Sequence, residues 1–337
     1  MRIPPHWLRW LTLTLALTVA GCASVSPPKP LSVISFPGGF NWPIWVAQDR
    51  NFFADEGLIV KLTPTTDSVF QMSGLIEGRF DIAMTALDNV VAYAEGQGEA
   101  PGSAGVFQPV VAFMGGDNGF LRLVTKPDVG DVAALKGRVL AVDALTTGYA
   151  FVLREMLARA GVLEGNVTFV RAGGALERFQ GLLANKFDAT LLISPFELQA
   201  QARGYKTLAS AIDMLGHYQG LVGATRRDFA QRNPQALSSY VKAYTSGVRW
   251  LLDPSHKAEA IEIFRKNLPN ANEAAANAAY SVLVNPRNGF ERNAHFDVEG
   301  ARTVLALRSK YGEPRKQLVD VSKYYDPRYY DAAGIGR

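Results

Sequence analysis

Two stretches near the N-terminus decide the fold of this chain: residues 42–62, WPIWVAQDRNFFADEGLIVKL, and residues 73–88, SGLIEGRFDIAMTALD. Pro43 is well placed in the first turn of a helix, and the apolar run at 58–62 that follows this helix predicts a strand. The second stretch contains the end of another helix, a glycine, and a second apolar run at 80–84. Together with an apolar run just before them, these stretches alternate strand and helix, which favours an α/β fold with a mostly parallel sheet.

The second of these stretches recurs weakly later in the chain. LIEGRFD at Leu75–Asp81 matches LLANKFD at Leu182–Asp188, and the same offset of 107 residues aligns the turn Phe36–Trp42 with Asp143–Tyr149. We interpret the repeat as two lobes of like topology, although chance similarity between α/β segments is the alternative. Each lobe then has a strand-to-helix turn at the carboxyl edge of its sheet, where open α/β sheets bind ligands.

The composition is that of a globular protein, with 337 residues, 48% hydrophobic and 20% charged. It is too apolar for a disordered chain and too mixed for a polytopic membrane protein, and its length suggests two lobes. The formal charge of +4 falls to +2 without the first 21 residues, which hold two arginines and no acid. A nearly neutral chain lacks the basic footprint of a nucleic-acid binder, so we expect no nucleic-acid partner.

The N-terminus, residues 1–21, has the features of an export signal: two arginines and an apolar run too short to span a bilayer. The only cysteine, Cys22, directly follows small residues, an arrangement that resembles the lipobox of bacterial lipoproteins. The resemblance implies a lipoprotein signal peptide at 1–21 and a lipid anchor on Cys22, facing the periplasm or the cell exterior. Residues 22–30 would form an extended tether. A secretory signal followed by a chance cysteine is the alternative.

Further segments connect the chain to a known family. The two opening stretches and three later ones together resemble the periplasmic substrate-binding proteins of ABC importers, more narrowly the nitrate/sulfonate/taurine and thiamine-precursor group. No single motif is specific, but the order and spacing of the segments over Leu31–Asp253 are similar to that family. The later segments are LKGRVLAV at 135–142, VRAGGALERFQGLLANKFDATLLISP at 170–195 and RRDFAQRNPQALSSYVKAYTSGVRWLLD at 226–253.

The resemblance implies a two-lobed periplasmic-binding-protein fold of the type II kind, in which each lobe is a mostly parallel sheet flanked by helices. The first lobe would hold residues 31–124 and 221–337, and the second would hold 125–220. The two chain crossings would lie near Leu121–Lys126 and Gly220–Thr225, and the C-terminal helices would pack mainly on the first lobe. A small-molecule solute would bind in the cleft of a monomer, and an ABC permease in the cytoplasmic membrane would be its partner.

Motifs of catalysis are absent from the sequence. The histidines after the signal are widely spaced, and there is no HExxH, CxxC, G-x-S-x-G or P-loop pattern. Cys22 lies at the anchor, which leaves no cysteine nucleophile. We therefore expect a binding protein with no enzyme activity, no cofactor and no metal. Two alternatives stay open: a ligand-sensing receptor for a membrane signalling partner, and an exported enzyme with an unrecognised acid–base site.

Ten residues in four turns are the candidate ligand contacts, because each turn lies at the carboxyl edge of a predicted strand. Aromatic faces can sandwich a flat ligand, while hydroxyls and main-chain amides at helix starts bind its polar atoms. Trp42 could equally anchor the core, and Asp88 could equally cap a helix. The candidates are Phe40, Asn41, Trp42, Thr85, Asp88, Asn89, Thr146, Thr147, Tyr149 and Ser194.

The charges in these turns indicate the chemistry of the solute. The turns and a neighbouring loop contain Asp88, Asp117 and Asp143, and the turns around Trp42, Asp88 and Tyr149 hold no Arg or Lys. Carboxylates in a cleft repel a compact anion, so we expect a neutral or weakly cationic organic solute, such as a heteroaromatic, rather than nitrate or sulfate. If Trp42 stacks on this solute, Trp42→Ala should weaken binding by roughly 1–3 kcal/mol. The alternative is that all three aspartates only cap helices.

Overall fold

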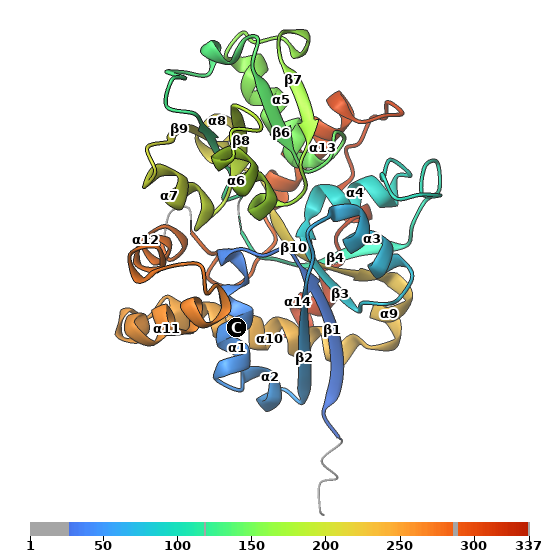
Figure 1. The fold of residues 1–337 in the computed structure, drawn as a ribbon. Helices are drawn as coiled ribbons and strands as arrows, with labels where there is room; N and C mark the ends of the chain where they lie inside the picture. The colour runs from blue at the N-terminus through green and yellow to red at the C-terminus, as the bar shows by residue number, and fades with distance from the viewer. Residues whose placement is uncertain (1–26, 118, 286–288, 336–337) are drawn as a thin grey trace, which may run out of the picture.

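The computed structural model describes residues 27–117, 119–285 and 289–335. The expected signal peptide, Cys22 and most of the expected tether lie outside these described residues. The described chain folds into two lobes, each built around a five-stranded sheet that helices flank (Figure 1). Within the described ranges, no helix combines the length and the apolar character needed to cross a membrane.

The first lobe, drawn lower in Figure 1, contains the strands β1 (Lys29–Ser35), β2 (Leu58–Pro64), β3 (Ile82–Ala86), β4 (Val110–Gly115) and β10 (Leu221–Arg226). Their order in the sheet is β2-β1-β3-β10-β4. β1 runs parallel to both β2 and β3. β10, which comes from much later in the chain, inserts antiparallel between β3 and β4.

The second lobe contains the strands β5 (Arg122–Thr125), β6 (Val139–Val142), β7 (Thr168–Arg171), β8 (Ala189–Leu192) and β9 (Lys206–Ser210). Their order is β7-β6-β8-β5-β9. β6 is parallel to β7 and β8, and β5 is antiparallel to β8 and β9. Each sheet is therefore mixed: four of its five strands run in the same direction, and one antiparallel strand, β10 or β5, lies between the fourth and the other three. The expected α/β fold of two lobes is confirmed.

The weak sequence repeat is confirmed as a structural repeat. Ser32 of β1 pairs with Lys61 of β2, and Val139 of β6 pairs with Thr168 of β7, so both pairs of partners are related by the same offset of 107 residues. The same offset relates the parallel pairs β1–β3 and β6–β8. The two lobes thus share the order and the register of their three parallel strands.

The chain passes between the lobes at residues 116–121, from β4 to β5, and at residues 216–220, on the way to β10. The crossings expected near Leu121–Lys126 and Gly220–Thr225 overlap these passages only at their first residue. They are displaced because apolar β5 and β10 pair fully within the sheets that the chain is entering. The positions that the family resemblance implied for the crossings thus fall mostly on sheet strands, and the passages precede them.

Helices cover both sheets. In the second lobe they are α5 (Gly148–Arg159), α6 (Ala175–Leu183), α7 (Phe196–Gln201) and α8 (Ala211–Leu215). Those of the first lobe up to β10 are α1 (Trp42–Asp49), α2 (Phe52–Asp55), α3 (Ser68–Ile76) and α4 (Leu87–Ala94). After β10 come α9 (Arg227–Arg232), α10 (Pro234–Leu251), α11 (Lys257–Asn267), α12 (Glu273–Leu283), α13 (Val298–Tyr311) and α14 (Arg328–Ala332).

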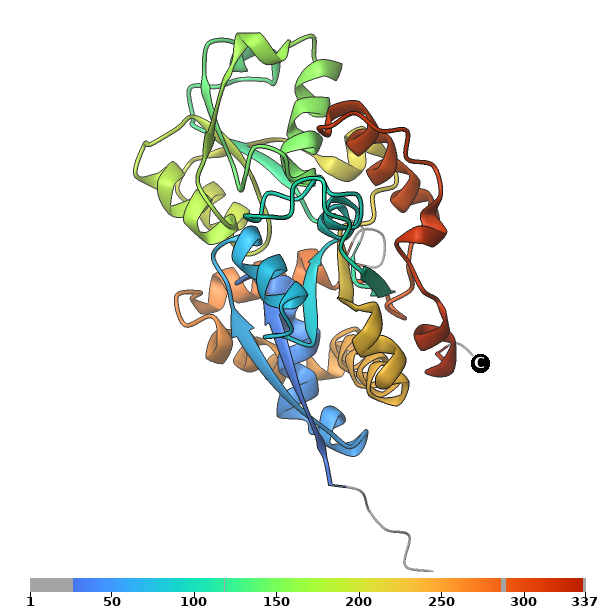
Figure 2. The same cartoon turned by 90° about the vertical axis from the view of Figure 1, so that its right-hand side faces the viewer.

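The C-terminal helices divide between the two lobes. α10 and α11 pack on α1, and α14 packs on β4 and α10, all in the first lobe. α12 contacts α7 of the second lobe, and α13 packs on α4 of the first lobe and on α5 of the second. In Figure 2 the red C-terminal segment runs along one side of the molecule beside both lobes. The C-terminal region therefore belongs mainly to the first lobe but reaches across to the second.

Candidate functional site

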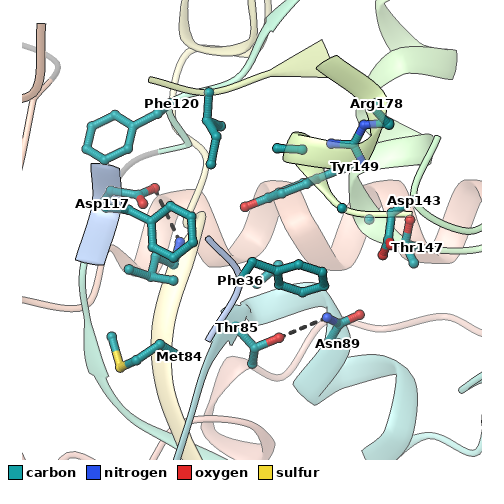
Figure 3. Close-up of a pocket in the computed structure, with 17 residues that line it drawn as sticks. Phe36, Met84, Thr85, Asn89, Asp117, Phe120, Asp143, Thr147, Tyr149 and Arg178 are labelled. Atoms are coloured by element: carbon teal, nitrogen blue, oxygen red, sulfur yellow. Dashed lines mark hydrogen bonds between the residues drawn. The ribbon is translucent and has the colours of Figure 1, made fainter. Parts of the chain in front are cut away.

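One pocket lies between the carboxyl edges of the two sheets and is lined by both lobes (Figure 3). It encloses about 700 Å³ of atom-free space, open solvent at its mouth included. Its lining residues are Phe36, Phe40, Met84, Thr85, Ala86, Asn89, Asp117, Phe120, Asp143, Thr147, Gly148, Tyr149, Gly174, Ala175, Arg178, Ile193 and Leu221.

The position of the pocket follows from the repeat. Phe36 comes directly after β1, and Asp143 comes directly after β6, which is the equivalent strand of the other lobe. Thr85 is the last residue but one of β3, and Ile193 directly follows β8, the equivalent strand of the other lobe. Because parallel strands end at the same edge of a sheet, these turns gather their side chains in one place in each lobe. The two edges face each other, so their turns form opposite walls of one pocket.

Aromatic side chains make up much of the wall. Phe36 and Phe40 come from the first lobe, Phe120 comes from the first passage, and Tyr149 lies at the start of α5 in the second lobe. Figure 3 shows the Tyr149 ring extending into the space between Asp117 and Arg178, above Phe36. The rings create a surface that suits a flat apolar group or the face of an organic cation.

Asp117 is the charged group on the passage side of the pocket, and only 4% of the residue is exposed. Its Oδ1 accepts hydrogen bonds from the main-chain N–H groups of Gly119 at 2.6 Å and Leu221 at 3.2 Å. Burial raises the pKa of the Asp117 carboxyl to about 6, although these two hydrogen bonds lower it. The carboxylate therefore joins the two passages and lines the pocket at once.

Arg178 and Asp143 form the charged part of the second lobe. Arg178, on α6, is 3% exposed and donates to the carbonyl oxygens of Gly173 at 2.8 Å and Leu191 at 3.1 Å. Its Nε and the Oδ1 of Asp143 have no hydrogen-bond partner among the described residues. Burial lowers the pKa of Arg178 and raises that of Asp143, and each charge opposes the shift of the other. This wall can donate and accept hydrogen bonds from a ligand.

Five of the ten residues singled out in the sequence line the pocket: Phe40, Thr85, Asn89, Thr147 and Tyr149. Asn89 donates through Nδ2 to the Thr85 hydroxyl at 2.9 Å, which fixes both polar groups and leaves the hydroxyl hydrogen for a ligand. Thr147 donates to the carbonyl of Ala144 at 3.1 Å, which holds the turn that begins α5. These residues come from both lobes, as a cleft ligand requires.

The structure places Trp42 in the core instead of the pocket. Trp42 is fully buried, its ring contacts Phe264 and Tyr280, and its Nε1 donates to the carbonyl of Ala260 at 3.1 Å. Its expected stacking on the solute is therefore wrong, because α11 and α12 cover it. The neighbouring Asn41 holds its own turn by donating to the carbonyl of Phe36 and accepting from Ser35 at 2.7 Å.

Asp88 and Thr146 lie beside the pocket and take part in contacts between lobes. Asp88 forms a fully buried ion pair with Arg308 of α13, and Arg308 also donates to the carbonyl of Thr146 at 2.8 Å. Asp88 is not a helix cap, since Ala86 occupies the N-cap of α4. A Cβ at Gly148 would lie 2.3 Å from the Cβ of Asp88, so the glycine permits the close approach of α5 to α4.

Ser194 is buried and bonds within its own lobe to Glu197, the first acid of α7. Burial raises the pKa of the Glu197 carboxyl to about 7, although the Ser194 hydroxyl lowers it. The main-chain oxygen of Ser194 nonetheless reaches the other lobe, where it accepts from the N–H of Gly39 at 2.8 Å. Ser194 therefore contributes to the contact between lobes through its backbone and does not line the pocket.

Several pocket residues were missed by reasoning from the sequence: Phe36, Met84, Phe120, Ile193, Leu221 and above all Arg178. The turns singled out in the sequence hold no Arg or Lys, but Arg178 of α6 brings a cation to the pocket from outside them. Arg178 was detectable, because it lies on the buried face of α6 with Ala175, Phe179 and Leu182. An arginine on the apolar face of an amphipathic helix needs a polar environment, and here the strand carbonyl and the pocket supply it.

The lobes also touch directly around the pocket. The N–H of Gly174 donates to the carbonyl of Thr66 at 3.0 Å. Glu99 accepts from the N–H of Thr146 at 2.8 Å and contacts its hydroxyl. Arg171, at the end of β7, lies 3.3 Å from Asp67 and 3.5 Å from Glu99, both in the first lobe. The structure therefore shows the lobes closed upon each other.

Metal ligands are not grouped in the described part of the chain: nowhere in it do three His, Cys, Asp or Glu residues lie close enough to hold an ion. The polar groups of the pocket are two carboxylates, one guanidinium, an amide and hydroxyls, among four aromatic rings. This set can bind an organic molecule through hydrogen bonds, charge and ring contacts.

Solved structures share this fold. A protein of Bordetella bronchiseptica RB50 matches with a TM-score of 0.76 and 18% identity, over 90% of this chain and 96% of that one. The alkanesulfonate-binding protein SsuA of Xanthomonas axonopodis pv. citri, bound to MOPS, has a TM-score of 0.72 and 14% identity, over 89% and 99%. The periplasmic nitrate-binding protein NrtA of Synechocystis PCC 6803 has a TM-score of 0.76 and 14% identity, over 91% and 88%.

At these identities the similarity shows the fold, which is that of periplasmic binding proteins. No curated protein matches the sequence. The model of one family, described as NMT1/THI5 like, matches residues 41–258. This range runs from just before α1 to the start of α11 and includes the whole second lobe and both passages. Since this match spans well over half of its residues, the chain belongs to the NMT1/THI5-like family.

Proposed function

We propose that the protein is an extracytoplasmic solute-binding protein that captures a small organic molecule between its lobes and delivers it to an ABC permease. It acts as a monomer and carries out no chemistry on the solute. The observation that carries the proposal is the pocket at the facing sheet edges, with lining residues from both lobes. The relatives in fold that bind sulfonate or nitrate support the same class of function.

Closure of the lobes is the step that links binding to delivery. A ligand in the pocket touches both walls, so it binds the closed arrangement better than an open one and shifts the population toward it. The contacts of Arg171 with Asp67 and Glu99, and those of Gly39 and Gly174, form only when the walls meet. A permease that requires both lobes in one geometry would then distinguish loaded from empty protein.

Attachment to a membrane is a further part of the proposal. Cys22 receives the lipid, and a tether connects it to β1, which begins at Lys29 and so contains the last two residues of the expected 22–30 segment. Mass spectrometry of the mature N-terminus should find an acylated Cys22, and Cys22→Ala should release the protein from the membrane fraction. An unmodified mature terminus at another residue would contradict the anchor but leave the solute site untouched.

Binding is tested with the purified protein and a thermal-shift panel of small anions, sulfonates, pyrimidines, aromatic acids and organic amines. A solute that raises the unfolding temperature should bind by calorimetry and should reduce the radius of gyration in X-ray scattering. Phe36→Ala removes one ring of the pocket wall and should weaken binding by roughly 1–3 kcal/mol. Phe70→Ala, which removes a ring that is 47% exposed on α3, is the matched control and should bind normally.

Two results would overturn the solute-binding proposal. One is a panel in which nothing binds the wild-type protein. The other is a bound solute whose affinity responds to Phe70→Ala but not to Phe36→Ala, because this would place the site away from the pocket. Turnover of a bound solute would replace the binding protein with an enzyme.

A further inference from the structure

Three carboxylates lie in or beside the pocket, and they differ in whether a neighbouring cation balances their negative charge. Asp88 is paired with Arg308, whose Nε lies 2.6 Å from its Oδ1, in a fully buried ion pair. Asp143 is stabilised by the charge of Arg178, which lowers its pKa. Asp117 is in no ion pair among the described residues, and burial raises its pKa while main-chain hydrogen bonds from Gly119 and Leu221 lower it.

A buried carboxylate without a cation is costly, so Asp117 needs a positive or strongly donating partner. Both main-chain N–H groups that reach Asp117 bind the same oxygen, Oδ1. Oδ2 receives no hydrogen bond from the described residues, and the pocket is the space that the carboxylate lines. No described residue supplies this partner, and a ligand in the pocket lies where it can do so.

The walls next to Asp117 favour a cation as well. Phe120, Phe36 and Tyr149 line the same pocket, and Figure 3 shows the Tyr149 ring lying between Asp117 and Arg178. Aromatic faces attract cations electrostatically, and more strongly when the cation is desolvated. A carboxylate beside several rings is thus the arrangement expected for an ammonium or amidinium group.

We propose that the solute carries a positively charged nitrogen group on a flat apolar body, and that Asp117 is its counter-ion. This inference rests on the proposed function and identifies the charge of its solute. The flat body lies among the aromatic side chains, and the charged end faces the passages between the lobes. Asp117 also accepts hydrogen bonds from Gly119 in the first passage and from Leu221, the first residue of β10 after the second passage. The charge of the ligand would therefore meet the segments that connect the two lobes.

Three compounds of nearly equal shape test the charge without any substitution: benzamidinium, benzamide and benzoate, with charges of +1, 0 and −1. Calorimetry on the wild-type protein should show benzamidinium binding at least about tenfold more tightly than the other two. A charged hydrogen bond contributes about 1.5–3 kcal/mol, which corresponds to about 10–100-fold in affinity. Benzoate or benzamide binding as tightly as benzamidinium, or more tightly, would overturn the inference.

Asp117→Asn tests the counter-ion. The amide oxygen can still accept from Gly119 and Leu221, so the passages keep their bonds while the charge is lost. Benzamidinium should bind about 10–100-fold more weakly to this variant, and benzamide should bind as it does to the wild type. Asp228→Asn, which removes a carboxylate on the surface of α9, is the matched control and should leave all three affinities unchanged. An undiminished preference for benzamidinium in Asp117→Asn would overturn the role of Asp117.

The pH dependence gives an independent measurement. The side chains that titrate near Asp117 are Tyr149 on α5, Tyr218 on the second passage and Tyr244 on α10, and burial raises the pKa of all three. Below pH 8 these tyrosines stay neutral and benzamidinium stays charged. Affinity should therefore rise with pH as Asp117 ionises near pH 6, and should be about tenfold lower at pH 5 than at pH 7.5. Asp117→Asn should remove most of this pH dependence. Any remainder would come from Asp143 and Arg178 on the opposite wall, which the substitution leaves unchanged.

The outcomes separate this inference from the proposed function. A wild-type protein that binds benzoate or another anion of the panel, and closes on it, keeps the proposed function and refutes the cation. A wild-type protein that binds no compound in either set refutes both.

Discussion

The two lobes repeat one framework but differ where that framework meets the solute. Asp81 and Asp188, at equivalent positions, each accept a hydrogen bond from the N–H of the neighbouring strand, at 2.8 Å from Ser32 and 2.9 Å from Val139. The helices α3 and α6 cover equivalent residues at the same offset of 107. In both, a glycine lies so close to a phenylalanine ring that a Cβ would be 2.6–2.7 Å from it.

The differences lie at the carboxyl edges of the sheets. Gln71 of α3 donates to the carbonyl of Met84 at 2.9 Å, and its counterpart Arg178 donates in the same way to Leu191. Trp42 is buried in the core, whereas its counterpart Tyr149 lines the pocket. The comparison teaches that strand pairing and helix packing constrain the same residue types in both lobes, while the edge positions can diverge to form a site.

The strongest test of this division uses the aromatic pair. Trp42→Ala should lower the free energy of unfolding by about 4 kcal/mol, because it leaves a cavity beside Phe264 and Tyr280. It should hardly change the affinity of the folded protein for its solute. Tyr149→Ala should do the reverse, with weaker binding and a smaller loss of stability. Chemical denaturation and calorimetry measure the two effects, and an affinity loss in Trp42→Ala without a stability loss would break the comparison.

The next effect concerns Asp88, whose counterpart in the second lobe is Pro195. Arg308→Met should cost about 3 kcal/mol of stability, because it leaves the Asp88 carboxylate buried without a partner. The double variant Asp88→Asn with Arg308→Met should recover a large part of this loss in chemical denaturation. Arg302→Met on the exposed side of α13 is the control and should be nearly neutral. Equal costs for the two arginines would show that the buried pair is not needed.

A smaller effect is expected at Glu197, whose counterpart in the first lobe is the buried Val90. Its folded pKa of about 7 lies above the value in the unfolded chain, so the folded state binds the proton more tightly. The contribution of Glu197 to the free energy of unfolding should therefore be most favourable at low pH and should fall as the pH rises from about 4.5 to 7. Glu197→Gln should add stability on the order of 2 kcal/mol at pH 8 and little at pH 5.

Thermal and chemical unfolding at both pH values measure this difference. Glu164→Gln, at a largely exposed side chain of the same lobe, should show no such gain at pH 8. A Glu197→Gln variant that is less stable than the wild type at pH 8 would mean that the carboxylate is well compensated there.

The smallest effect tests the shared framework. Asp81→Ala and Asp188→Ala should each cost about 1 kcal/mol, because each leaves a strand N–H without its acceptor. Lys126 and Arg138 also contact Asp188, and its strand hydrogen bond and Lys126 hold its pKa below the ordinary range against the effect of burial. Its contribution is therefore present above the unfolded pKa and fades as pH falls through the lower folded pKa. Denaturation at pH 7 should show the full loss in both variants, and the loss in Asp188→Ala should shrink as the pH is lowered below the unfolded pKa. Costs that differ severalfold at pH 7 would break the equivalence.

The sequence predicts the framework well because the framework is local. The basic-Phe-Asp element follows a residue with positive φ in both lobes, Gly78 at 80° and Asn185 at 57°, and these are the residue types that adopt this conformation most readily. Alternating strand and helix patterns then suffice for the topology of the parallel strands. The crossings were displaced by a few residues, because the sequence does not show whether an apolar run still lies in a passage or already pairs in a sheet, as β5 and β10 do.

The site is less predictable because its contents depend on distant residues. Position at the end of a strand was enough to select Thr85, Asn89 and Tyr149. It could not show that α11 and α12 cover Trp42, or that an arginine 220 residues away pairs with Asp88. The direction of a side chain in a turn is set by the helices that pack on it, and these belong to the C-terminal region.

The strand order of the first lobe has a consequence for how the protein is made. β10 separates β3 from β4 in the finished sheet, yet the whole second lobe is synthesised between β4 and β10. A growing chain therefore completes all strands of the second lobe while the sheet of the first lobe still lacks β10, the strand that pairs with both β3 and β4. Contacts between such distant segments form slowly, and the unpaired edges of β3 and β4 would be open to wrong partners during that interval. Export in an unfolded state, followed by folding of the full-length chain, would shorten the life of this intermediate.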